Sequence, residues 1–99
     1  METYEFDAEL YVWASDGASW VFLDLPHGVT DEIDDGPREP RPGFGSVRVE
    51  VSVGSSTWRT SVFPSKRKGT YVLPVKKAVR RAEGVEAGDV VRVRLSVLD

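Results

Sequence analysis

Hydrophobic and polar residues alternate along three long segments of the chain. Valine occupies every second position from 47 to 53, and valine or leucine does so from 91 to 97, with polar residues between them. Residues 4–12 follow the same rhythm, with Glu5 and Asp7 on the polar side. Because successive side chains of a strand point to opposite faces, this pattern predicts three half-buried strands.

Three shorter segments predict further strands. Residues 20–25 are apolar on both sides, which is typical of a central strand or of one that crosses from one sheet to another. Residues 58–63 and 70–75 are bounded by the turn-forming segments 54–56 and 64–69. Six closely spaced strands in so short a chain predict a mainly β fold, a small six-stranded barrel.

Two segments carry a helical pattern instead. The first has four apolar residues at helical spacing, with basic residues on the opposite arc; they are Val75, Ala78, Val79 and Ala82. This spacing predicts one principal amphipathic helix over about residues 75–83, ended by Gly84 as a left-handed C-cap. Near residues 30–35, Thr30 or Asp31 could cap a turn or two of helix.

The length and composition point to one small globular domain. A chain of 99 residues, 40% of them hydrophobic, can build one core, so we expect a single β-barrel domain over residues 1–99. Cysteine is absent, which excludes disulfides and thiolate metal sites. The acidic N-terminal segment does not resemble a signal peptide, and no apolar run is long enough to span a membrane. We therefore expect a soluble cytoplasmic protein without a membrane partner.

The chain offers no convincing catalytic set. His27 is the only histidine, and it follows Pro26 in an acidic segment where a surface position is expected. Four carboxylates lie close together in that segment, at Asp31, Glu32, Asp34 and Asp35. They lack the glutamate that ends a calcium-binding loop, so a solvated acidic loop is the simpler interpretation. We predict that the protein is not an enzyme, with no catalytic residues, bound metal or cofactor.

The charges are unevenly distributed along the chain. Residues 1–40 hold 11 acidic side chains and one basic one, whereas residues 64–82 hold seven basic side chains and no acid. The basic residues are Lys66, Arg67, Lys68, Lys76, Lys77, Arg80 and Arg81. They could contact the phosphates of a nucleic acid, with Tyr71 or an exposed Trp13 as a stacking surface. The acidic pI of about 5.1 and the helical periodicity favour a solvated helix face instead.

Several residues recur in the order and spacing of a known family. They are Trp20, Leu25-Pro26, the valine-rich strand, Trp58, Thr60-Ser61, Pro64, Gly69, Tyr71, Leu73-Pro74-Val75, the basic helix and Gly88-Asp89-Val91. In this the chain resembles the family called domain of unknown function 1905 over roughly residues 4–97. The resemblance implies a small split β-barrel with one principal helix, similar in shape to the swapped-hairpin barrels of bacterial transition-state regulators and antitoxins. It implies no activity and no site residues.

Three functional hypotheses follow. The preferred one is a non-catalytic binding or interaction module, whose partner is unknown and whose open strand edges would allow a homodimer. An alternative is nucleic-acid binding through the basic turn and helix at residues 66–81. A second alternative is a small-molecule pocket inside the barrel, lined by Trp20, Trp58 or Tyr71, although side chains normally fill so narrow a barrel.

Overall fold

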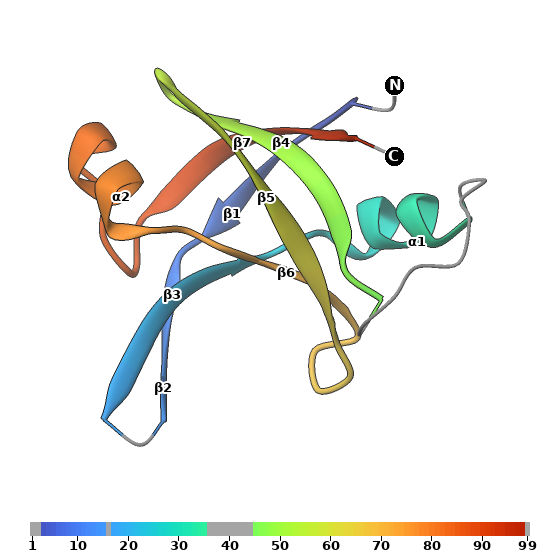
Figure 1. The fold of residues 1–99 in the computed structure, drawn as a ribbon, viewed down its shortest axis with the longest axis horizontal. Helices are drawn as coiled ribbons and strands as arrows, with labels where there is room; N and C mark the ends of the chain where they lie inside the picture. The colour runs from blue at the N-terminus through green and yellow to red at the C-terminus, as the bar shows by residue number, and fades with distance from the viewer. Residues whose placement is uncertain (1–2, 16, 36–44, 99) are drawn as a thin grey trace.

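A computed structural model describes residues 3–15, 17–35 and 45–98 of the chain, and these residues form a curled antiparallel sheet with two short helices (Figure 1). The strands are β1 (Thr3–Glu9), β2 (Tyr11–Ser15), β3 (Ala18–Asp24), β4 (Val47–Val53), β5 (Ser56–Ser65), β6 (Thr70–Pro74) and β7 (Val90–Val97). The helices are α1 (His27–Asp35) and α2 (Lys77–Glu83). The predicted mainly β, barrel-like fold is confirmed, with seven strands among the described residues instead of six.

The sheet curls because one strand belongs to both of its halves. The strand order is β1-β7-β4-β5-β6-β3-β2, and neighbouring strands are antiparallel. Residues 56–62 of β5 pair with β4, whereas Phe63 to Ser65 pair with β6. Because β5 changes partner at Phe63, the first part of β5 and the end of β6 separate, which leaves a split in the barrel wall.

The additional strand arises from a corner in the first predicted strand. Residues 4–12 were expected to be continuous, but the chain turns at Leu10, which is buried, and β2 then pairs with β3. The Leu10 N–H donates to the Asp89 carbonyl at 2.9 Å, and the Leu10 carbonyl accepts from the Gly88 N–H at 2.7 Å. The corner is therefore held by the segment that precedes β7. Strands β2 and β3 extend beyond the barrel as a projecting hairpin (Figure 1).

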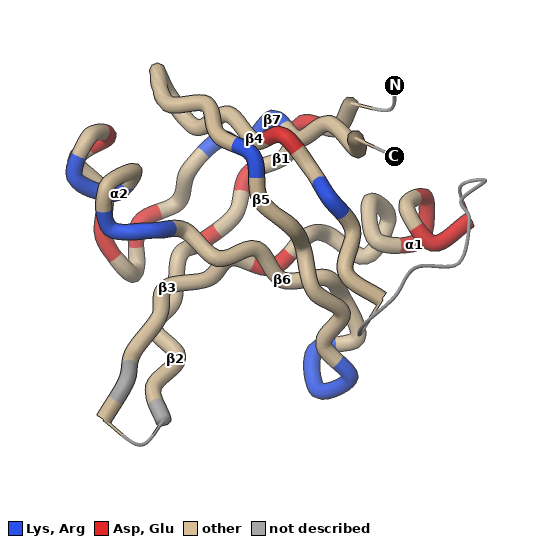
Figure 2. The backbone as a smooth tube through the Cα atoms, in the orientation of Figure 1, with Lys and Arg blue, Asp and Glu red and all other residues tan. Residues whose placement is uncertain are grey.

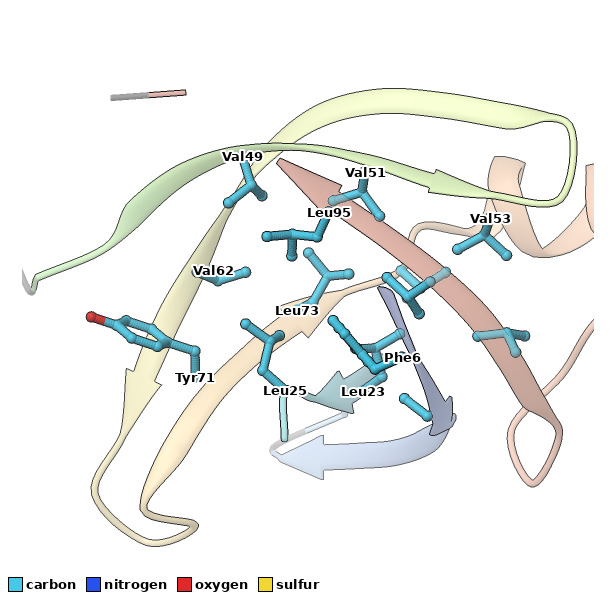
Figure 3. Close-up of a cluster of buried hydrophobic side chains, with 14 of the residues drawn as sticks. Phe6, Leu23, Leu25, Val49, Val51, Val53, Val62, Tyr71, Leu73 and Leu95 are labelled. Atoms are coloured by element: carbon cyan, nitrogen blue, oxygen red, sulfur yellow. The ribbon is translucent and has the colours of Figure 1, made fainter. Parts of the chain in front are cut away.

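The alternating residues form the core as predicted (Figure 3). Val47, Val49, Val51 and Val53 of β4 are all buried, as are Val91, Val93, Leu95 and Val97 of β7. Figure 3 shows Val51 and Leu95 pointing toward Leu73 and Leu23 of the other half of the sheet, both of which are fully buried. Burying this apolar surface is the main favourable contribution to folding, at roughly 25 cal/mol for each Å² removed from water.

Both helices differ in detail from the sequence-based prediction. Helix α1 begins at His27 and spans nine residues, so it is longer than the expected turn near residues 30–35. Its Ile33 is buried, and Tyr71 of β6 donates to Asp34 at 2.6 Å, which fixes α1 over one end of the barrel. Helix α2 begins two residues later than expected and buries only Val79; Ala78 and Ala82 are exposed. Gly84 is the left-handed C-cap, as predicted.

Glu83, at the end of α2, anchors the turn between β4 and β5. Its carboxylate accepts from the Ser55 N–H at 3.2 Å, the Ser55 hydroxyl at 3.1 Å and the Ser56 hydroxyl. Hydrogen bonds from Ser56 and Ser55 hold the pKa of this carboxyl below its ordinary value. The charged form is thus stabilised in the folded state.

We expect the stabilising contribution of Glu83 to depend on pH. A lowered folded-state pKa gives stability that is fully present above the ordinary value near 4.5 and is lost as the pH falls through the folded-state value. The wild type should therefore exceed Glu83→Gln in urea midpoint at pH 7, and the difference should shrink below pH 4.5. Urea denaturation of both proteins at pH 7 and pH 3.5 measures this, and a constant difference would contradict it.

Candidate functional site

The projecting hairpin of β2 and β3 carries exposed aromatic side chains. Trp13 and Trp20 are cross-strand partners, 43% and 47% exposed, and their rings stack with centroids 5.4 Å apart. The second alternative placed Trp20 in a pocket inside the barrel, and this placement is wrong. Val21 and Leu23 take the inward positions of β3, so Trp20 and Phe22 lie on the outer face.

A hollow of about 670 Å³ lies between this hairpin and the turn that joins β5 to β6. Its lining residues are Tyr11, Trp13, Phe22, Pro64, Ser65, Arg67, Lys68 and Val72. One wall is thus aromatic, from β2 and β3, and the other carries two cations from the turn. A hollow with one aromatic and one cationic side can hold a ligand that has both a flat apolar part and a negative charge.

A hydrogen-bonded group fixes one side of this hollow. The Tyr11 hydroxyl donates to Asp24 Oδ1 at 2.6 Å, and Lys68 Nζ lies 3.4 Å from Asp24 Oδ2 and 4.4 Å from the centre of the Tyr11 ring. Burial, followed by the hydrogen bond to Asp24, raises the pKa of Tyr11. Tyr11 therefore stays a neutral donor, and Asp24 neutralises part of the Lys68 charge. Arg67 makes no ion pair with residues 3–15, 17–35 or 45–98.

A second hollow, of about 360 Å³, lies in the split between β5 and the end of β6. Its lining residues are Ser19, Trp20, Val21, Trp58, Arg59, Thr60, Pro74, Val75, Lys76, Lys77 and Arg80. Trp58 points inward and is partly buried against the core, whereas Trp20 reaches the hollow from the hairpin. This hollow therefore repeats the combination of indole and cationic side chains found in the first one.

Strand β6 and the Trp13–Trp20 stack connect the two hollows. Trp13 lines the first and Trp20 the second, while Val72 and Pro74 of β6 line the first and second respectively. We call the combined lining the aromatic and basic surface. Its aromatic members are Tyr11, Trp13, Trp20, Phe22 and Trp58, and its basic members are Arg59, Arg67, Lys68, Lys76, Lys77 and Arg80.

Acidic and basic side chains are only partly separated in the molecule (Figure 2). Figure 2 shows the acids of α1 at one end of the molecule and the cations of α2 at the opposite end, with a second basic group in the β5–β6 turn. Asp7 of β1 pairs with Arg92 of β7 at 3.3 Å, and Glu50 of β4 pairs at the same distance with Arg59, which belongs to the aromatic and basic surface. Arg59 and Lys68 of this surface are paired with Glu50 and Asp24, and its other four cations leave it locally positive despite a net charge of −3.

The seven predicted basic residues fall into two groups. Lys66, Arg67 and Lys68 lie in the β5–β6 turn, and Lys76, Lys77, Arg80 and Arg81 lie on or beside α2. Lys66 lines neither hollow, and Arg81 lines a separate one with Glu86 and Asp89. Of the two expected stacking residues, Tyr71 is buried, whereas Trp13 is exposed as the prediction required.

Sequence reasoning missed Tyr11, Trp20, Phe22 and Arg59 as members of this surface. A signal for the first three was present, because Asp16-Gly17 is a typical hairpin dipeptide midway between Trp13 and Trp20. Recognising that hairpin would have paired the two tryptophans on one face. Nothing comparable in the sequence indicates that Arg59 would border the split in the barrel.

The other candidate sites gain no support from the described residues. His27 is exposed at the start of α1, and no group of three or more metal-ligating side chains forms within the part of the chain that the structure describes. The lining expected for an interior pocket is not assembled, since Trp20 is outside and side chains such as Leu23, Leu73 and Leu95 fill the interior. Among the described residues, no helix has the length and apolar character needed to cross a bilayer.

The homodimer stays a prediction. Strands β1 and β2 end the sheet, so each has one edge without a partner strand in the described chain.

Comparison with known proteins places the chain in one family. No curated protein matches the chain. The model of the family described as "Domain of unknown function (DUF1905)" matches residues 6–95. This range contains all the strands and helices described above except the first residues of β1 and the last residues of β7. Because this match covers nearly the whole chain, the protein belongs to the DUF1905 family.

Proposed function

We propose that this domain is a non-catalytic binding module whose ligand is an extended, phosphate-bearing anion held on the aromatic and basic surface. The observation that carries the proposal is that two hollows on one surface each combine aromatic rings with cations, and that β6 and the Trp13–Trp20 stack join them. A ligand that spans both hollows would meet cations at its two ends and apolar rings between them.

Both groups of cations on this surface include members that are available to a ligand. Arg67, Lys76 and Lys77 form no ion pair with the residues that the structure describes. Each phosphate that such a cation neutralises releases condensed counterions, so binding is favoured at low salt and weakens steeply as salt is added. The cations of the turn and those of α2 lie at opposite ends of β6, a strand of five residues. At about 3.3 Å per residue the two groups are on the order of 20 Å apart, which suits a polymer better than a single small anion.

The proposal is tested with inorganic polyphosphate as the probe, and its binding is measured by isothermal titration calorimetry. The test variant is Arg67→Ser, Lys76→Ser and Lys77→Ser combined, which removes cations from both groups. The control is Arg48→Ser, Arg92→Ser and Arg94→Ser combined, which removes the same charge from the outer face of β4 and β7. We expect the test variant to bind at least about tenfold more weakly at 50 mM salt. The slope of log K against log salt concentration should also become shallower, by about one for each lost phosphate contact.

The control variant should bind nearly as the wild type does. Equal losses in the two variants would show that only net charge matters, and undetectable wild-type binding at low salt would show that the surface takes no phosphate polymer. Either result would overturn the proposal.

A further inference from the structure

We infer that the ligand of this surface is a single-stranded nucleic acid, whose unpaired bases stack on Trp13 and Trp20 while its phosphates reach the two cationic groups. This inference rests on the proposed function and identifies the class of ligand. Its starting point is that the hairpin keeps two stacked indoles 43% and 47% exposed, in a molecule that buries 20 hydrophobic side chains among its described residues.

A polymer made only of phosphate has no flat apolar group that could stack on these indoles. Large aromatic rings left in water favour a ligand with flat apolar groups, because stacking removes apolar area from water on both partners. A nucleic-acid strand carries such a group and a phosphate in every repeat. Stacking on aromatic side chains is the usual way in which proteins hold unpaired bases, and it tolerates any base because each has a flat face.

The geometry favours a single strand over a duplex. In a duplex the base faces are covered by neighbouring bases, and proteins reach only base edges in the grooves. The indoles of Trp13 and Trp20 already stack on each other, so a base would extend the stack from an outer ring face instead of entering between the rings. That mode needs a base free of the duplex, and the hollow of about 670 Å³ beside Trp13 is in the size range of small-ligand sites.

The arrangement of charge agrees with this assignment. The hollow beside Trp13 contains Arg67 and Lys68, and the hollow beside Trp20 contains Lys76, Lys77 and Arg80. A strand whose bases lie on the indoles therefore has cations on both sides for the flanking phosphates. Small β-barrels that bind single strands in this way cover roughly 4 to 16 nucleotides, so an octanucleotide is long enough to span the surface.

The experiment compares three labelled probes by fluorescence anisotropy at 50 mM salt. They are an eight-residue oligothymidine, an eight-residue abasic strand with the same sugar-phosphate backbone, and an eight-base-pair duplex. We expect the oligothymidine to bind at least about tenfold tighter than the abasic strand, because only the bases can stack. The duplex should bind no tighter than the abasic strand does.

Variants then locate the stacking residues. The double substitution of Trp13→Ala and Trp20→Ala should lower the affinity for oligothymidine about tenfold, to that of the abasic strand, because the bases lose their stacking partners while the cations remain. The conservative pair Trp13→Phe and Trp20→Phe keeps ring faces and should retain most of the advantage. Because the two side chains are 43% and 47% exposed and stack on each other, urea midpoints of both variants are measured alongside to confirm that the domain stays folded under the binding conditions.

The outcomes separate this inference from the proposed function. Equal binding of oligothymidine and the abasic strand would overturn the single-strand assignment, while polyphosphate binding would still support the phosphate surface. Duplex binding as tight as that of oligothymidine would also overturn it. If polyphosphate and all three probes fail to bind, both proposals are wrong.

Discussion

Replacing Leu95 by alanine is expected to lower the free energy of unfolding by about 3 to 5 kcal/mol, the range typical of leucine in a core that cannot collapse around the cavity. Leu95 is fully buried in β7, where it lies opposite Tyr4 of β1 and Val51 of β4. The barrel wall on both sides is held by ladder hydrogen bonds, so its side chains cannot close the space. A domain of this size is stable by only about 5 to 15 kcal/mol, so the loss is a large share of the total.

Val90→Ala is the matched control, because it truncates a side chain of the same strand that is 64% exposed. Its effect should stay within about 0.5 kcal/mol of zero. Urea denaturation monitored by circular dichroism gives both values. Similar losses in the two variants would contradict the inward direction assigned to Leu95, and with it the register of β7.

The strands that could be predicted best are those with one buried face and one solvent-exposed face. In β4, the predicted range of residues 47–53 is the observed one, because every inward position is valine and every outward position is polar. A shift of one residue would put all four valines into water, so the sequence specifies this register strongly. The same reasoning explains the success with β7.

The corner at Leu10 could not be predicted from alternation. Residues on either side of it continue the period of two, but the chain turns there into the other half of the sheet, where Gly88 and Asp89, almost 80 positions away, hydrogen-bond to the Leu10 backbone. The face of α2 was misjudged for a similar reason. Helical spacing predicted that Ala78 would be buried, but α2 lies at the rim of the barrel and buries only Val79.

The candidate site was predictable in its charges and much less so in its aromatic rings. A run of cations is visible in the sequence wherever it lies, and so the two basic groups were identified. The aromatic wall depends on which strands neighbour β6. Trp20 is brought beside Lys76 and Lys77 by the pairing of β3 with β6, which joins residues about 50 positions apart. Such long-range pairing leaves no local pattern.

Replacing Gly54 by alanine is expected to destabilise the protein by clearly more than the same change at Gly84. Both glycines have positive φ, 59° and 65°, where a side chain costs roughly 1 to 2 kcal/mol. At Gly84 an added Cβ meets no atom within 4 Å, so only this backbone cost applies. At Gly54 the Cβ would overlap the carboxylate of Glu83, and that carboxylate would have to leave Ser55 and Ser56.

The backbone cost is nearly the same in both alanine variants. The difference between their free energies of unfolding therefore measures how much the Glu83 hydrogen bonds stabilise the β4–β5 turn. Urea denaturation at pH 7 gives the difference, and repeating the pair in a Glu83→Gln background tests its origin. In that background the hydrogen bonds are already weakened, so the two glycine substitutions should approach each other in effect. A difference that persists unchanged would assign the cost to the turn backbone itself, and would mean that α2 is held on the barrel mainly by the burial of Val79.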